Sequence, residues 1–203
     1  MRLTVVYEHW HLGDGNYPAF TLGDEVRLSF ELDVTAAETV SDDTPLLFRQ
    51  DRDAHYDATA RVIRRYGDGI SDTFPVFDAG DFRFYSPSWC TAGLPVGAVV
   101  RLQGRLALDH YLWVEFLDRY PDPPELFYNL RVVRIRTIVI PDRFIHRGAR
   151  SLRYPTALSP TQYGDAAWRD AQRVEEHESG PSFSLVDFEE LPPGSGPENP
   201  TFL

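Results

Sequence analysis

The sequence predicts a mainly β protein: a single antiparallel β-barrel or sandwich, followed by one C-terminal helix and a flexible acidic tail. Up to residue 150 the chain consists of short runs of alternating apolar and polar residues, separated by turn residues, without strong helical periodicity. After residue 150 the composition changes, first to a helix-start signature and then to a stretch rich in proline and glycine.

The clearest strand is predicted over residues 24–34. Every second residue of this segment is apolar: Val26, Leu28, Phe30, Leu32 and Val34. This alternation is typical of a strand with one buried face. Residues 98–108 repeat the pattern, and both segments contain Gly-x-x-Val-Arg-Leu, starting at Gly23 and at Gly97. We therefore expect both strands to begin after a glycine turn.

Alternating patterns also predict strands over residues 3–11, 56–66, 74–78, 81–86, 111–117 and 126–140. In the last of these segments the period slips at Val132 and Val133, which a β-bulge would explain. Bulges bend strands as barrel closure requires. The barrel domain is therefore predicted over residues 1–150.

Residues 151–179 are predicted to form a linker and a docked helix. Ser159-Pro160-Thr161-Gln162 supplies an N-cap, a proline at the first helical position and a capping-box glutamine, and Gly180-Pro181 ends the helix. Residues 180–203 contain five prolines, three glycines and four acids, which indicates a flexible tail. The apolar residues of this tail are candidate contacts for a partner: Phe183, Leu185, Phe188 and Phe202.

Composition excludes several classes of function. All 20 basic residues are arginine, so the lysines of P-loops and Schiff-base enzymes are missing, and one cysteine excludes an internal disulfide. The net charge of −11 disfavours non-specific attachment to nucleic acid or to anionic membranes. No run approaches the roughly 18 apolar residues of a membrane helix, and Glu8 and His9 interrupt any signal peptide. We expect a cytoplasmic protein with no cofactor and no membrane contact.

One segment reverses the charge. Residues 131–150 carry six arginines against one acid, whereas the segments on either side are acidic. Arginines can follow a phosphate backbone while aromatic residues stack on bases. The candidate residues for binding nucleic acid or a partner are Arg131, Arg134, Arg136, Phe82, Phe84 and Tyr85. The alternative interpretation is that the phenylalanines are core residues and that the arginines pair with nearby acids.

The glycine-started strands, the bulged strand and the acidic tail with an apolar end together resemble an oligonucleotide/oligosaccharide-binding (OB) fold over residues 22–140 and the tail. Bacterial single-stranded DNA-binding proteins have this layout. The resemblance implies a barrel that binds single strands and a tail that recruits partners. The tail here departs from that family, because it lacks an aspartate cluster beside its Phe202-Leu203 end.

A metal site is a further hypothesis. His9 and His11 would share one face of a strand, with Asp14 in the following turn, and two histidines with one carboxylate can form a facial metal triad. The alternative is a surface strand followed by a turn aspartate.

The function that the sequence favours is a non-catalytic module that binds a basic protein partner, for example as an adaptor or a toxin-neutralising immunity protein. An OB-like binder of single-stranded nucleic acid is the first alternative. A metal-dependent enzyme that uses His9 and His11 is the second.

Overall fold

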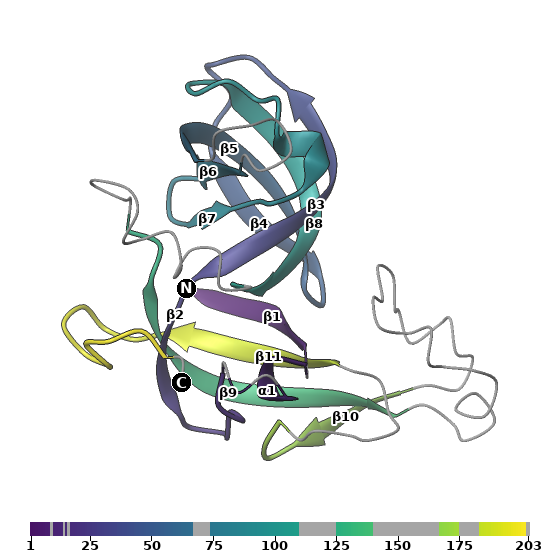
Figure 1. Cartoon of the computed structure of the whole chain (residues 1–203), viewed down its shortest axis with the longest axis vertical. Coiled ribbons are helices and arrows are strands. Elements are labelled where there is room, and N and C mark those ends of the chain that lie inside the picture. The colour runs from purple at the N-terminus through teal and green to yellow at the C-terminus, as the bar shows by residue number, and fades with distance from the viewer. Residues whose placement is uncertain are drawn as a thin grey trace. The chain divides into compact units, whose positions relative to one another are not determined.

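The computed structural model describes residues 1–8, 10–13, 15, 17–66, 74–109, 125–139, 167–174 and 183–201. The chain divides into two compact units, which are described separately (Figure 1). Unit 1 comprises Met1–Arg2, Val6–Val26 and Asn129–Leu203, and unit 2 comprises Leu3–Val5 and Arg27–Tyr128. Both are built mainly from β-strands. None of the described helices is long and apolar enough to cross a membrane.

Unit 1 is organised around the long strand β9 (Tyr128–Val139). Strands β10 (Ala167–Ala171) and β11 (Phe183–Glu190) flank it and pair with it in antiparallel fashion. Strand β1 (Arg2–Glu8) follows β11 in the sheet, and β2 (Glu25–Leu28) also pairs with β9. A single helical turn, α1 (Trp10–Gly13), follows β1. The four strands β10, β9, β11 and β1 lie side by side in Figure 1.

Aromatic residues fill the core of unit 1. The rings of Tyr7 and Phe20 lie 5.1 Å apart edge to face, and those of Phe20 and Phe188 lie 6.0 Å apart. All three side chains are buried. Phe188 of β11 therefore belongs to the same core as Tyr7 and Phe20 from the N-terminal part of the chain.

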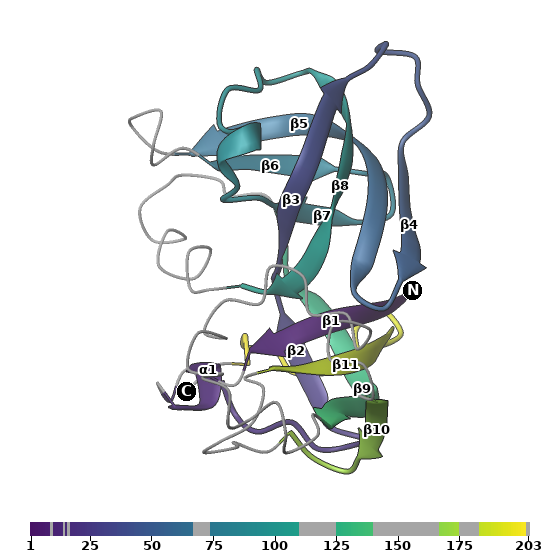
Figure 2. The ribbon, with the colours of Figure 1, turned by 90° about the vertical axis from the view of Figure 1, so that its right-hand side faces the viewer.

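Unit 2 contains a closed five-stranded barrel (Figure 2). Its strands are β3 (Phe30–Thr39), β8 (Val99–Leu108), β5 (His55–Tyr66), β6 (Phe74–Asp78) and β7 (Arg83–Tyr85). Each pairs with the next in antiparallel fashion, and β7 closes the ring by pairing with β3 in parallel. Strand β4 (Leu47–Arg52) pairs with β5 and lies outside the ring.

An aromatic cluster fills one part of unit 2. Phe82 lies at its centre, with ring centroids 4.4 Å from Phe48, 5.9 Å from Phe84 and 5.0 Å from Tyr128. At the bulge between β3 and β8, Gly104 lies so close to β3 that a Cβ atom there would be 2.6 Å from the carbonyl oxygen of Asp33. Only a residue without a side chain fits this approach.

A second layer covers the opposite face of β3. Ser29 and Glu31, which the alternation assigns to the polar face, are buried beside Tyr85. Tyr85 in turn packs with Tyr66, Phe74, Val76 and Leu126 in an apolar cluster. The barrel wall is therefore buried on both sides at this point.

Several sequence predictions are confirmed. The mainly β class and the barrel are present, and Gly23 and Gly97 have φ angles of 91° and 94°, as the two glycine turns require. The predicted bulge is also present, because Asp187 of β11 pairs with Arg134 while the next residue, Phe188, pairs with Val132. Val133 is the extra residue.

Other predictions are wrong in the described residues. The first strand ends at Glu8, the second is interrupted at Ser29, and β4 is not among the predicted strands. The helix predicted within 151–179 does not cover Ala167–Ala171, which form β10 because they pair with β9. The flexible tail predicted over 180–203 contains β11, whose apolar residues are buried. The strand predicted at 111–117 lies outside the described residues.

Candidate functional site

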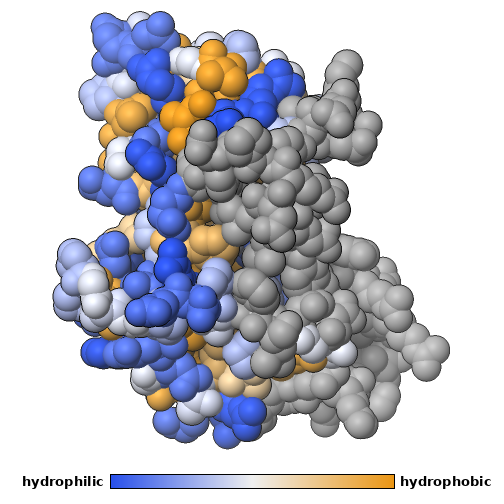
Figure 3. Space-filling model, turned by 60° about the vertical axis from the view of Figure 1, so that its left-hand side comes forward, coloured by the Kyte–Doolittle hydropathy of each residue, from blue (hydrophilic) through white to orange (hydrophobic). Residues whose placement is uncertain are grey.

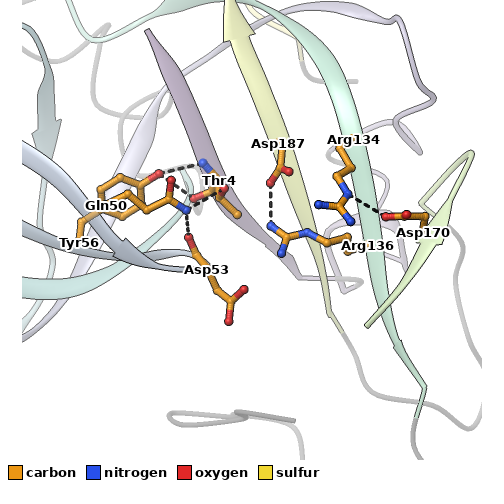
Figure 4. Close-up of polar contacts among 8 residues, drawn as sticks. All are labelled: Thr4, Gln50, Asp53, Tyr56, Arg134, Arg136, Asp170 and Asp187. Carbon is orange, nitrogen blue, oxygen red and sulfur yellow. Dashed lines mark hydrogen bonds and ion pairs between the residues drawn. The ribbon is translucent and has the colours of Figure 1, made fainter. Parts of the chain in front are cut away.

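The three predicted arginines lie on β9 and are ion-paired within unit 1, and Figure 4 shows the pairs of Arg134 and Arg136. Arg134 Nε lies 2.7 Å from Asp170 on β10, and Arg136 Nη2 lies 2.9 Å from Asp187 on β11. Arg131 Nη2 lies 2.7 Å from Glu25. The charge of each arginine is therefore balanced by a neighbouring strand.

The pairing of β10 with β9 places Asp170 near two of these arginines. Asp170 lies directly opposite Arg136 but bonds Arg134, so it lies between two guanidinium groups. The hydrogen bond from Arg134 is the main cause that lowers the pKa of Asp170 below its usual value near 3.8, and the charges of Arg134 and Arg136 add to it. The pKa of Arg134 is raised by the same bond.

The three predicted aromatic residues belong to the core of unit 2. Phe82, Phe84 and Tyr85 are at most 1 % exposed, so their rings do not offer a stacking surface for bases. This observation and the ion pairs agree with the alternative interpretation of these six residues. The structure does not bring them together as an exposed basic and aromatic surface within either unit.

The predicted metal site is not formed on a strand. His11 lies in α1, is fully buried, and has its ring 5.8 Å from Tyr7 and 5.4 Å from Tyr17. His9 and Asp14 lie outside the described residues. Within the part of the chain that the structure describes, no three His, Cys, Asp or Glu residues form a group that could hold a metal.

The predicted tail contacts are part of unit 1. Phe183, Leu185 and Phe188 are buried in β11, so they are not a free contact segment, and Phe202 lies outside the described residues. The acids of this strand are also used internally. Glu189 pairs with Arg2, and Glu190 pairs with the N-terminal ammonium group.

A buried polar cluster in unit 2 was missed by sequence reasoning. The hydroxyl of Tyr85 donates to Asp109 and lies 2.9 Å from Glu31 Oε2, while Ser29 Oγ donates to Asp109 Oδ2 over 3.0 Å. Burial, followed by the nearby charges of Asp109 and Glu31, raises the pKa of Tyr85 well above 10. The phenol therefore stays neutral, and since all four residues are at most 3 % exposed, the cluster offers no access to a substrate.

One large side chain of unit 2 is almost completely exposed. Trp89 begins the short 3-10 turn η1 (Trp89–Thr91), between β7 and β8, and is 89 % exposed. The sequence analysis did not identify it as a candidate contact residue. Cys90 is half-buried, and burial raises the pKa of its thiol, which makes it a poor nucleophile.

The backbone that carries Trp89 is firmly held. Ser88 Oγ accepts from the backbone N–H of Val34 over 2.7 Å, and Thr91 Oγ1 donates to the carbonyl of Ser88 over 2.7 Å. Cys90 Sγ donates to the carbonyl of Val34 over 3.3 Å. Ser88, Cys90 and Thr91, which flank Trp89, are thus tied to β3 or to the turn itself, while the indole is exposed to solvent.

Such an arrangement suits binding rather than catalysis. Tryptophan is enriched among the residues that dominate binding energy at protein interfaces. A turn whose backbone is already fixed loses little backbone freedom when a partner covers its side chain. Figure 3 shows one face of the molecule, on which hydrophilic residues dominate the described surface and hydrophobic areas lie between them.

Comparisons of the chain with protein-family models, with curated proteins and with solved structures find no match.

Proposed function

We propose that this protein is a non-catalytic binding module that acts through protein–protein contact, with Trp89 as a central contact residue. The observation that carries the proposal is the 89 % exposure of this indole on an anchored turn. Exposing a large aromatic side chain to water forgoes the stabilisation that burial would give, on the order of 2 kcal/mol or more. A partner that covers the indole recovers this free energy.

Surface charge supports a basic partner. In unit 2 the exposed residues Arg49, Arg83 and Arg101 are each paired with an acid. Four further aspartates are exposed and form no ion pair among the described residues: Asp42, Asp43, Asp51 and Asp81. With a net charge of −11, such a surface attracts a positively charged protein and speeds their encounter. A cytoplasmic adaptor or a toxin-neutralising immunity protein would act in this way.

Affinity capture tests this proposal. Full-length protein is used to capture partners from nuclease-treated native lysate, beside the variants Trp89→Ala and Val133→Ala. Val133 is exposed on β9 and controls for the loss of an exposed apolar side chain elsewhere. We expect one basic protein to be retained by the wild type and by Val133→Ala, and to be lost with Trp89→Ala. Equal capture by all three proteins, or capture of no protein, would overturn the proposal.

A second candidate is an OB-like binder of single-stranded nucleic acid, since OB folds are also small five-stranded barrels. Phosphates would then have to displace acids from arginines such as Arg134, whose side chain is 52 % exposed. Binding should weaken steeply with salt, and Arg134→Ala should reduce the slope of log affinity against log salt by about one. Binding that is independent of salt would exclude this candidate.

A further inference from the structure

Strand β4 is the edge strand of the sheet in unit 2. It is the last strand in the sheet order, it pairs with β5, and no second strand pairs with it among the described residues. Figure 2 shows it at the margin of the barrel. Five of its six residues are exposed, and the sixth, Phe48, packs on Tyr56 and Phe82. An edge strand presents backbone N–H and C=O groups that can pair with another chain.

The two ends of β4 differ in how they are protected. At the C-terminal end a bulge lies between Gln50 and Arg52, and the Gln50 amide donates to Thr4 Oγ1 and to the carbonyl of Asp53 (Figure 4). Bulges and polar covers are the usual means of blocking an edge. The N-terminal end instead exposes Leu46 and Leu47, which are 37 % and 48 % accessible.

Acids lie in the two segments that adjoin this apolar end. Asp42 and Asp43 are exposed in the connection that precedes β4, and Asp81 is exposed in the turn between β6 and β7. That turn is close to Leu46, because a Cβ atom at Gly80 would lie 3.8 Å from Leu46 Cβ.

Two arginines and one further acid also contribute to the net charge of this region. The Arg61 guanidinium donates to the carbonyl oxygens of Gly97 and Asp42 and pairs with no carboxylate among the described residues, whereas the charge of Arg83 is balanced by its ion pair with Asp78. Three acids against Arg61 leave an excess of about two negative charges in the two segments that adjoin Leu46 and Leu47.

We propose that the outer edge of β4 binds an extended segment of the partner protein in which apolar and basic residues alternate. This inference rests on the proposed protein-binding function and names the segment that the partner would supply. The segment's backbone would add a strand to β4, its apolar side chains would cover Leu46 and Leu47, and its basic side chains would face Asp42, Asp43 and Asp81. Strand addition supplies affinity through main-chain hydrogen bonds, and the charges select the partner.

The test uses full-length protein and two capped ten-residue peptides of equal composition. One alternates valine and lysine, and the other places five valines before five lysines. Amide exchange of the protein is measured with and without each peptide, and affinities are measured by fluorescence anisotropy. We expect the alternating peptide to protect backbone amides of β4 and to bind about tenfold more tightly than the block peptide.

Exposed-site variants assign the contact. Leu47→Ser should weaken binding of the alternating peptide several-fold, and the double variant Asp43→Asn, Asp81→Asn should weaken it and flatten its salt dependence. Val133→Ala should bind like the wild type. Equal binding of the two peptides, or protection that spares β4, would overturn the inference.

The outcome is separable from that of the proposed function. Trp89-dependent capture of a partner without protection of β4 would leave the binding module in place and remove only the β4 assignment. Protection of β4 by the peptide without any Trp89-dependent capture would retain the edge site and reject Trp89 as the contact that carries the function.

Discussion

Replacing Tyr85 with phenylalanine removes a single oxygen atom from a buried site that two carboxyl groups share. The hydroxyl bonds Asp109 and lies 2.9 Å from Glu31 Oε2, and the ring packs in an apolar cluster that the substitution keeps. Phenylalanine has almost the same shape, so the effect reports the polar contacts and not a cavity.

The size of the effect follows from these contacts. A hydrogen bond to a charged group contributes about 1.5–3 kcal/mol, and a buried polar group that loses its partner costs about 1–3 kcal/mol. The phenol has one hydrogen and can donate to one carboxyl group at a time, so we count one full bond and one partial loss. We therefore expect Tyr85→Phe to lower the free energy of unfolding by about 3 kcal/mol.

Urea denaturation at pH 7, followed by circular dichroism, measures this loss. Tyr128→Phe is the matched control, because its hydroxyl bonds the backbone of Arg83 in an exposed position, and we expect it to cost less than about 1 kcal/mol. Equal losses for the two variants would refute the reasoning.

The same residue gives stability a dependence on alkaline pH. The pKa of Tyr85 is raised above 10 in the folded protein, so above pH 10 the unfolded chain releases the phenolic proton while the folded chain keeps it. The contribution of Tyr85 is therefore complete below pH 10 and falls as the pH rises further. The wild type should lose stability above pH 10 more steeply than Tyr85→Phe, and parallel curves would contradict the raised pKa.

Three further predictions test other parts of the structure. Gly104→Ala should lower the free energy of unfolding by about 1–3 kcal/mol in thermal melts, because the added Cβ meets backbone, whereas Gly93→Ala, with open space around it, should be nearly neutral. The carboxyl of Asp170 should titrate below 3.8 in a pH series of NMR spectra, and Arg134→Gln should move its pKa back up; equal values would contradict the ion pair. Phe188→Ala should destabilise unit 1 by about 3–5 kcal/mol and expose β11 to proteases. An unchanged melting temperature would instead support the prediction that this segment is a flexible tail.

The alternation of apolar residues predicted much of the barrel correctly. Val26, Leu28, Phe30, Leu32 and Val34 are all buried, as expected. Glycine turns and the bulge beside Val133 were predictable because they depend on local backbone geometry. Ser29 and Glu31 were assigned to the solvent face, since the layer that buries them comes from a distant part of the sequence.

The C-terminal region was harder to predict from local signals. Prolines and glycines indicated a tail, yet Phe183 and Leu185 already show a strand period, and pairing with β9 fixes them in place. The capping box predicted a helix that would include Ala167–Ala171. These residues form a strand instead, because their backbone pairs with β9. Local propensity is a weak guide where tertiary pairing is available.

The candidate site was not predicted. The aromatic residues predicted to bind are core residues, and the arginines predicted to bind are ion-paired. Trp89 was not predicted to be an exposed contact residue. A tryptophan within a Pro-Ser-Trp-Cys connection is a usable signal, but only the structure shows that its backbone is anchored and its ring exposed.

The dissociation constant of the captured basic partner, measured for the wild type, Trp89→Ala and Val133→Ala, tests the central claim most directly. A contact residue of this kind contributes at least about 2 kcal/mol, so Trp89→Ala should weaken binding by about 30-fold or more, while Val133→Ala should leave it unchanged. A dissociation constant for Trp89→Ala within about twofold of the wild type would contradict the assignment of Trp89 as the contact that carries the function.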